Sequence, residues 1–158
     1  MTHEGRKEMQ VEIRPLQEND IGALAEIEAE AFSMPWSEQG FRELLNHSYC
    51  FYLVALVQGR VAGGCGYTEV CHEANIDNVV VAGQYQNRGI AQKLLRALIA
   101  RGEAEGVEAF TLEVRVSNAA AIHIYEKYGF RSEGIRPGFY EKPREDAMIM
   151  WRRHTDLQ

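Results

Sequence analysis

The loop "QNRGIAQ", residues 86–92, carries residue types that bind anions. It follows a run of valines and precedes a segment whose apolar residues recur at helical spacing. Gly89 leaves room for a ligand beside the backbone, and the first amide hydrogens of a helix have no partner within it. With the positive charge of Arg88, the loop suits a phosphate or pyrophosphate group. An ordinary strand-to-helix turn with a solvated arginine fits the same residues.

Two other phosphate-binding motifs do not fit this loop. A P-loop needs a Gly-Lys-Ser/Thr tripeptide after its glycines, and none follows Gly89. A dinucleotide fingerprint needs several glycines within a strand-helix-strand unit, and this loop has a single glycine. From these residues alone, an anion site of another kind and an ordinary turn both remain open.

Two residues further along the chain have the chemistry to move protons, Glu113 and Tyr125. Glu113 lies in an expected strand where Leu112 and Val114 face one way and Glu113 the other, so its carboxylate could point into a cleft. Tyr125 shares one face of an expected helix with apolar and aromatic residues. From these patterns alone, a surface carboxylate beside Arg115 is the simpler interpretation of Glu113. A core aromatic is the alternative for Tyr125.

The rest of the sequence predicts the elements that position these residues. Ser37 and Asn118 are expected to cap the second and fourth helices, and Asn19 or Asp20 the first. Strands are indicated by β-branched and aromatic segments, and helices by apolar residues at helical spacing, so the fold class is α/β (α+β). The expected strands are 11–15, 49–57, 60–70, 74–82, 107–117, 131–140 and 145–151, the second to fourth running antiparallel, and the expected helices are 21–31, 38–47, 119–128 and one from Ile90 to Gly106.

The length and the net charge of the chain limit how many domains it can form and which partners it can bind. A chain of 158 residues leaves no room for a second independent core, so one domain is expected over 11–153, between an extension, 1–10, and a tail, 154–158. No apolar run is long enough to cross a bilayer, and the start lacks a secretory stretch, so a cytoplasmic protein without a membrane partner is expected. The net charge of −6 disfavours a nucleic-acid partner and suits a cationic one.

The three cysteines predict neither a metal site nor a catalytic thiol. Cys50, Cys65 and Cys71 lack the paired short spacings of a zinc site. Cys71 beside His72 could form half of such a site, but no second pair accompanies it. The sequence therefore predicts reduced thiols and no metal.

The segment "VVVAGQYQNRGIAQKLL", residues 79–95, resembles the acetyl-coenzyme A signature of the GNAT acetyltransferases, Q/R-x-x-G-x-G/A, with Gln86, Gly89 and Ala91 at its positions. The likeness continues through "LEVRVSNAAAIHIYEKYGF" and "EDAMIMW", which resemble the branch that acetylates protein N-termini. From "PWS" to Met150 it is nearly continuous. "AGQ" stands where relatives often have Asp-Pro, and Ala91 replaces a commoner glycine. Neither change removes an amide donor.

This resemblance implies a GNAT fold: a single mixed, mostly antiparallel twisted sheet of about seven strands with about four flanking helices. Two central strands would splay apart and admit the pantetheine of acetyl-coenzyme A. Glu113 would be the general base, acting through water, and Tyr125 would protonate the departing thiolate and contact the cofactor. His123 lies off the face of Tyr125 and is expected to be solvated. The other implied cofactor contacts are Val79, Val80, Val81, Asn87, Arg88, Gly89, Ile90, Ala91, Gln92 and Asn118.

The resemblance also implies an acceptor site for a protein N-terminus. Met34, Pro35 and Trp36 would supply apolar walls, and Tyr140 would close the peptide site. Phe139 stands where many relatives carry a second tyrosine, so one hydroxyl is missing. Acidic side chains within 141–146 could attract a basic peptide. The implied function is transfer of an acetyl group to the N-terminal alanine of ribosomal protein number eighteen of the small subunit.

Two alternatives remain open at this point. A GNAT enzyme that acetylates a protein lysine or a small-molecule amine would share the cofactor motif, and a deep acceptor cleft open at one end would favour it. A non-catalytic acyl-coenzyme A-binding module would have no use for Glu113 and Tyr125 together.

Overall fold

The computed structural model describes residues 10–77 and 79–154. Residues 1–9 of the expected extension and residues 155–158 of the expected tail lie outside this description. The strands are β1 (Val11–Pro15), β2 (Cys50–Val57), β3 (Arg60–Val70), β4 (Glu73–Ile76), β5 (Val80–Val81), β6 (Ala109–Arg115), β7 (Arg131–Glu141) and β8 (Arg144–Arg153). The helices are α1 (Ile21–Ala31), α2 (Glu38–Leu44), α3 (Ile90–Ala104) and α4 (Ala119–Lys127).

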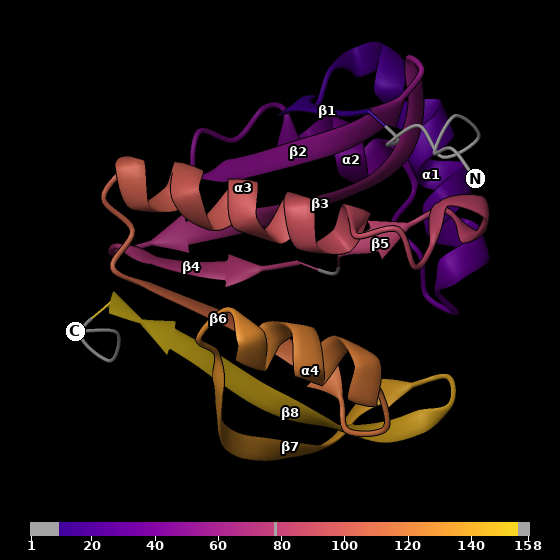
Figure 1. Cartoon of the computed structure of the whole chain (residues 1–158). Coiled ribbons are helices and arrows are strands. Elements are labelled where there is room, and N and C mark those ends of the chain that lie inside the picture. The colour runs from indigo at the N-terminus through magenta and orange to yellow at the C-terminus, as the bar shows by residue number, and fades with distance from the viewer. Residues whose placement is uncertain (1–9, 78, 155–158) are drawn as a thin grey trace, which may run out of the picture.

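The strands form one eight-stranded sheet in the order β1-β2-β3-β4-β6-β8-β7, and β5 pairs with β3 further along that strand. All pairs are antiparallel except β4 with β6, which are parallel. Figure 1 shows α3 and α4 on the near side of the sheet and α1 and α2 on the far side. The expected mixed, mostly antiparallel sheet with four helices is confirmed, with eight strands in place of about seven.

The strand β2 is buried on both of its faces. Leu53, Ala55 and Val57 pack into a core with α3, whereas Val54 and Leu56 pack into a second core with α1 and α2. A strand covered by helices on both sides needs apolar residues at consecutive positions, which explains the unbroken run "CFYLVALV".

The strands β6, β8 and β7 are covered on one face only. Leu112 and Val114 of β6 pack into the core beneath α3 and α4, together with Met150 of β8. Within the described part of the chain, the core of α1 and α2 contains no residue of these three strands. The other face of β6 therefore carries Glu113 and Arg115, both partly exposed.

The predicted strand over residues 74–82 is wrong in one respect, because the chain forms two short strands there. The strand β4 pairs with β6 only from Glu73 to Asn75, and β6 then runs on beside β8. The strand β5 turns back onto β3, where Val80 lies opposite Gly64. A Cβ atom on Gly63 would come within 2.3 Å of the Val80 carbonyl oxygen, so only glycine permits this approach. Central strands that pair briefly and then part are those that the fold class predicted.

Two of the three helix caps predicted from the sequence are found in the structure. The Ser37 hydroxyl accepts the Gly40 amide at 3.1 Å, and the Asn118 side chain accepts the Ala121 amide at 3.2 Å. Asp20 does not cap α1 with its side chain. Its carboxylate instead accepts two hydrogen bonds from Arg14, of 2.7 and 3.0 Å, because a guanidinium offers a stronger partner than a helix amide. The second helix is also shorter than expected, ending at Leu44.

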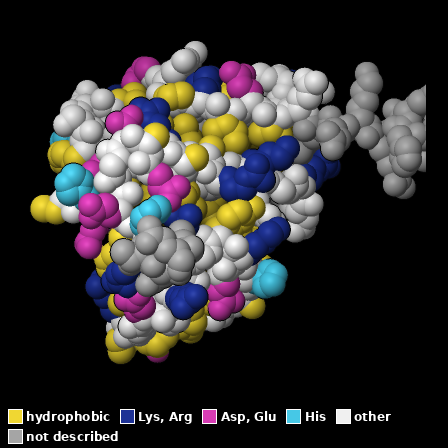
Figure 2. All heavy atoms as spheres, turned by 60° about the vertical axis from the view of Figure 1, so that its left-hand side comes forward, with side chains coloured by type: hydrophobic (Ala, Val, Ile, Leu, Met, Phe, Trp, Pro, Cys, Tyr) yellow, Lys and Arg dark blue, Asp and Glu magenta, His cyan; other side chains and the backbone are white. Residues whose placement is uncertain are grey.

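Three further features concern the charges on the surface, the length of the helices and the cysteines. On the face drawn in Figure 2, acidic and basic side chains are interspersed. No described helix is long and apolar enough to span a membrane. The three cysteines are free thiols, and no group of three or more potential metal ligands occurs within 10–77 and 79–154.

Candidate active site

The start of α3 leaves backbone amides available for a ligand. Gly89 adopts a left-handed conformation with φ of 79° immediately before the helix, and Asn87 has φ of 63°. The first helical hydrogen bond runs from the Lys93 amide to the Gly89 carbonyl, so the amides of residues 90–92 have no partner within the helix. Arg88 is exposed at the same place. These features suit an anionic group, as the sequence predicts.

Two glutamines of this segment hold it in place. The Gln86 amide donates to the Val81 carbonyl at 3.3 Å, which joins the loop to the end of β5. The Gln92 side chain accepts from Lys127 and from the Tyr128 hydroxyl, both at 3.1 Å. The second pair of bonds joins α3 to the end of α4, so the two helices that flank the parted strands are tied together.

The three predicted valines differ in what they can offer a ligand. Ala82 donates its amide to β3, so by alternation Val80 also directs its backbone toward β3. Val79 and Val81 then direct their backbone groups away from β3; Val79 lines the splay cavity described below, and the Val81 carbonyl accepts the Gln86 side-chain amide. The side chain of Val80 is buried in the core of α1 and α2. Contact of all three valines with the cofactor stays a prediction, and the pairing of Val80 with Gly64 makes its backbone the least accessible of the three.

A cavity of about 430 Å³ lies where the central strands part. We call it the splay cavity. Its lining brings together six residues that the sequence singled out, although they come from segments far apart in the chain. These six are Met34, Val79, Glu113, Asn118, Tyr125 and Tyr140.

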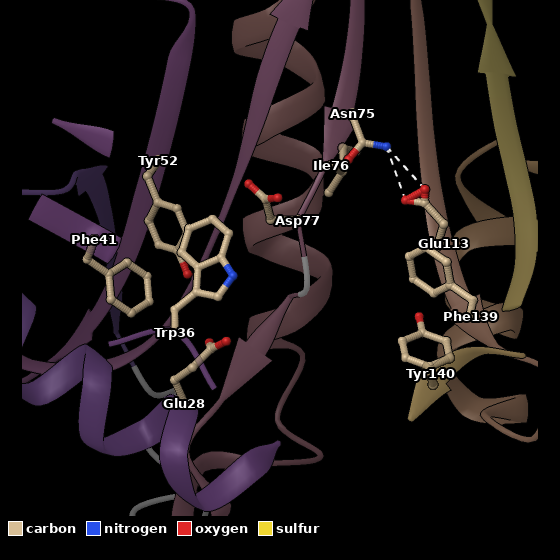
Figure 3. Close-up of a pocket in the computed structure, with 10 residues that line it drawn as sticks. All are labelled: Glu28, Trp36, Phe41, Tyr52, Asn75, Ile76, Asp77, Glu113, Phe139 and Tyr140. Atoms are coloured by element: carbon tan, nitrogen blue, oxygen red, sulfur yellow. Dashed lines mark hydrogen bonds between the residues drawn. The ribbon is translucent and has the colours of Figure 1, made fainter. Parts of the chain in front are cut away.

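A second cavity, of about 230 Å³, lies on the face of the sheet that carries Glu113. We call it the aromatic cavity, and Figure 3 shows its lining residues. Glu113 and Tyr140 line both cavities, so they stand at the junction between them. The other residues that line the aromatic cavity are Glu28, Trp36, Phe41, Tyr52, Asn75, Ile76, Asp77 and Phe139.

Glu113 faces away from the core, as its strand pattern predicts. Its carboxylate accepts hydrogen bonds from the Asn75 side-chain amide at 3.2 and 3.5 Å (Figure 3). Asn75 is the last residue of β4 that pairs with β6. The sequence did not single out Asn75, because the parallel pairing that brings it beside Glu113 has no local signature.

Tyr125 fits both interpretations of its helical face. Its ring packs edge-on against Phe130, with centroids 5.8 Å apart, and belongs to the core beneath α3 and α4. The same residue lines the splay cavity. Burial raises the pKa of its phenol well above the usual range, so the hydroxyl keeps its proton. His123 is exposed, as expected.

Arg115 holds Tyr140 in place at the mouth of the cavities. Its guanidinium lies 4.3 Å from the centroid of the Tyr140 ring and 3.2 Å from the Glu145 carboxylate. It also donates to the carbonyls of Lys142 and Pro143, in the turn between β7 and β8. This contact network fixes the hairpin that carries Tyr140. Sequence reasoning treated Arg115 only as a neighbour of Glu113.

The segment expected to form the acceptor wall is divided between the two cavities. Met34 lines the splay cavity, and Trp36 lines the aromatic cavity. Pro35 is exposed and lines neither of these two cavities, so its contact with the acceptor stays a prediction. Phe139 lines the aromatic cavity beside Tyr140.

Two acidic residues in the aromatic cavity escaped the sequence analysis. Glu28 lies on the buried face of α1 and is 4% exposed, and Asp77 follows β4. Burial is the main cause that raises the pKa of each carboxyl to about 7. One signal was available for Glu28, because it stands four residues after Leu24 on the apolar face of the helix.

The comparisons with known proteins agree with this geometry. Residues 21–130 match the model of the acetyltransferase (GNAT) family. The chain belongs to this family, whose members transfer an acetyl group from acetyl-coenzyme A, and it is an acetyl-coenzyme A-dependent N-acetyltransferase. The family predicted from the sequence is confirmed.

Similarity to curated proteins indicates which branch of the family this chain resembles. The chain is 36% identical over 140 residues to the putative [ribosomal protein bS18]-alanine N-acetyltransferase of Bacillus subtilis (strain 168), covering 88% of this chain and 93% of that protein. It is 38% identical over 140 residues to the [ribosomal protein bS18]-alanine N-acetyltransferase of Escherichia coli (strain K12), covering 87% and 94%.

Solved structures share the fold. The crystal structure of the ribosomal-protein-S18-alanine N-acetyltransferase from Escherichia coli matches with a TM-score of 0.84 at 36% identity, covering 91% of this chain and 94% of that one. Ard1 from Thermoplasma volcanium matches with a TM-score of 0.83 at 25% identity, covering 90% and 97%. The predicted fold is thereby confirmed as that of the family.

Proposed function

We propose that this protein transfers an acetyl group from acetyl-coenzyme A to the α-amine of the N-terminal alanine of ribosomal protein bS18. The observation that carries the proposal is the position of Glu113 at the junction of the two cavities. One cavity extends between the parted strands, and the other opens on the opposite side of Glu113. The similarity to two bS18-alanine N-acetyltransferases over most of the chain supports the choice of acceptor. With this acceptor, the cytoplasm is the expected place of action.

The residues of this chain fit acetyl-coenzyme A, which supplies an activated thioester when bound. The amides of residues 90–92, with Asn87 and Arg88, suit the pyrophosphate, because the amides lack helical partners and the site has a positive charge. The left-handed Gly89 allows the ligand to approach the backbone. The backbone groups of Val79, which lines the splay cavity, suit the amides of pantetheine.

Glu113 is proposed as the general base. An α-amine has a reference pKa of about 8, so it arrives mostly protonated at neutral pH and must lose a proton before it attacks. The Asn75 amide donates to the carboxylate and orients it, as a positioned base requires. Glu113 accepts the proton through water.

Tyr125 is proposed as the general acid. Its phenol lines the splay cavity and stays protonated because burial opposes the phenolate. It can give its proton to the departing thiolate. Asn118 lines the same cavity and caps α4, so it helps to fix the helix that carries Tyr125.

The aromatic cavity is proposed as the binding place of the first acceptor residue. Its volume of about 230 Å³ suits a small side chain such as that of alanine. Trp36 forms one wall, and Tyr140 with Phe139 forms the other (Figure 3). A non-catalytic binding module would not need a carboxylate held by Asn75 at the junction of the two cavities.

Mass spectrometry of acetylated peptides tests this proposal. A peptide that starts with alanine, has basic residues downstream and contains an internal lysine is incubated with the protein and acetyl-coenzyme A. We expect the acetyl group on the terminal amine and an unmodified lysine. The matched control is the same peptide with its terminus already acetylated, which should gain nothing. Acetyl groups on the lysine with a free terminus would contradict the proposal and support the lysine alternative.

A further inference from the structure

Two carboxyl groups in the aromatic cavity have no part in the proton transfers above. Glu28 extends from α1, and Asp77 follows β4 at the point where the central strands part. Figure 3 shows Asp77 between the aromatic wall of Trp36 and Tyr52 and the strand that carries Glu113. Both carboxyls line the cavity in which the acceptor is proposed to bind.

Asp77 carries a buried oxygen that no residue within 10–77 and 79–154 pairs with. The Oδ2 atom has essentially no solvent exposure and no hydrogen-bond partner among the described residues. The backbone is fixed, because the Asp77 amide donates to the Gly66 carbonyl at 2.8 Å. A buried acceptor without a partner is unfavourable, so an oxygen held in this way suits a donor from a ligand.

The rest of the cavity favours a ligand with a positive charge. Its described lining residues include three carboxyl groups and neither lysine nor arginine. Its aromatic walls add to this preference, since the faces of Trp and Tyr rings attract ammonium groups. A small first residue of the acceptor brings one such group, the α-ammonium.

We propose that Asp77, with Glu28 beside it, forms the subsite that binds the α-ammonium of the acceptor before Glu113 removes its proton. This inference rests on the proposed function and adds a selection step to it. Asp77 recognises the protonated amine and places it within reach of Glu113, so it determines specificity and Glu113 carries out the chemistry. No bond forms or breaks in this step.

The electrostatic surroundings of Asp77 make this binding depend on pH. Burial, and then the nearby acids, raise the pKa of the Asp77 carboxyl to about 7, so below that pH the group is neutral and pairs poorly with an ammonium. The Michaelis constant for the peptide should therefore rise as the pH falls below about 7. The titratable groups that face Asp77 are Glu28 from α1, Tyr52 from β2, Cys65 from β3 and Glu113 from β6.

Calorimetry with the full chain and free coenzyme A tests the subsite without turnover. Two peptides are compared, one starting with alanine and one in which a hydroxyl replaces its α-amine. We expect the parent to bind the amine peptide at least tenfold more tightly. In Asp77→Asn the preference should fall below threefold, with weaker binding of the amine peptide alone. In steady-state assays, the same variant should raise the peptide KM more than it lowers kcat.

Two further variants keep the test decisive. Glu126→Gln removes one exposed carboxylate of α4 outside both cavities and should retain the full preference. Glu28→Gln removes the nearest acid, so the pH midpoint of the peptide KM should move below that of the parent. This second readout applies even if Asp77→Asn fails to fold.

Three results would contradict the proposed ammonium subsite. Asp77→Asn could bind both peptides as the parent does, or it could lose affinity for both equally, which would indicate a structural role. An unchanged pH midpoint in Glu28→Gln would count against the pair in the same way. If the parent binds the amine peptide selectively yet acetylates no terminus, the proposed function fails and the subsite stands.

Discussion

The strands β2 and β6, which lie in different halves of the sheet, have opposite surroundings. The strand β2 is buried on both faces, between α3 on one side and α1 with α2 on the other. The strand β6 is buried on one face, and its other face carries Thr111, Glu113 and Arg115. The sequences record this difference, since "CFYLVALV" is apolar throughout and "AFTLEVR" alternates.

This difference divides the sheet into a half that stabilises the fold and a half that is open to an acceptor. In the N-terminal half, β1 to β5, apolar side chains form two cores, one on each side of β2, and Asn75 of β4 lies at the boundary beside Glu113. In the C-terminal half, β6 to β8, the open face relies on charged contacts such as those of Arg115 with Glu145 and Arg153 with Glu133. The proposed site lies at the boundary, where a peptide can reach Glu113.

The largest effect is expected for Glu113, on the open face. A positioned base contributes about 10²–10⁴ in rate, so Glu113→Gln should lower kcat by at least about tenfold without changing the thermal midpoint by more than a few degrees. Raising the pH deprotonates the amine without help and should recover part of the loss. Steady-state kinetics from pH 6 to 9, with a thermal melt, measure both.

Tyr125→Phe is the matched contrast to Glu113→Gln. It should also lower kcat, but a higher pH should bring no comparable recovery, because the variant lacks a proton donor. A kcat within twofold of the parent for either variant, with chemistry shown to limit the rate, would remove that residue from the mechanism.

The next largest effect compares one aromatic residue from each half. Phe41 is fully buried beneath α1 and α2, so Phe41→Ala should lower the free energy of unfolding by about 3–5 kcal/mol. Trp151 of β8 is only partly buried, with its ring 4.4 Å from the Arg153 guanidinium, and Trp151→Ala should cost clearly less. Urea unfolding of both variants measures the difference. Equal losses would show that the open face stabilises the fold as much as the covered one.

A smaller effect, with a definite sign, is expected at Glu28, an acid buried in the covered half. Its pKa is raised to about 7, so the folded state favours the protonated carboxyl. Stability is therefore reduced progressively as the pH rises from about 4 to 7, because the unfolded chain ionises first. Glu28→Gln should raise the free energy of unfolding at pH 8 by up to about 3 kcal/mol and leave it nearly unchanged at pH 4. Stability of the variant below that of the parent at pH 8 would contradict this.

The smallest effect is expected for the ion pair of Arg153 with Glu133, which joins β8 to β7 on the surface. Partly exposed pairs contribute about 0–1 kcal/mol, so Arg153→Met should change the free energy of unfolding by no more than that. The change should shrink further in 0.5 M salt, because salt screens exposed charges. A loss of several kcal/mol in urea unfolding would contradict this. It would show that charged contacts contribute more to the stability of the C-terminal half than is expected of partly exposed ion pairs.

The covered half could be predicted from the sequence more fully than the boundary. The caps Ser37 and Asn118 and the orientation of Glu113 follow from local patterns, which need no knowledge of distant residues. The break between β4 and β5 was not predicted, although Asp77 and Asn78, which stand within residues 74–82, are residue types depleted in strands. It arises where the pairing of β4 with β6 ends, and that pairing depends on residues more than thirty positions apart.

The same reasoning explains the polar residues that were missed. Asp20 looks like a helix cap until Arg14 of β1 is seen beside it. In the sequence Glu28 is marked only by its place on the apolar face of its helix, and only the folded chain brings it and Asp77 to one cavity. Asn75 likewise gains its importance from Glu113, its hydrogen-bond partner across the parallel pair.

The place of β8 in the sheet determines when the enzyme can become active during its synthesis on the ribosome. This strand, Arg144–Arg153, is the last of the described chain, yet it lies between β6 and β7. A domain generally folds as a unit, so the sheet is complete only once β8 has been translated and has inserted between β6 and β7. Glu113 and Tyr140 then lie on strands that are joined only through β8. A nascent chain should therefore remain inactive until its final strand has emerged and inserted.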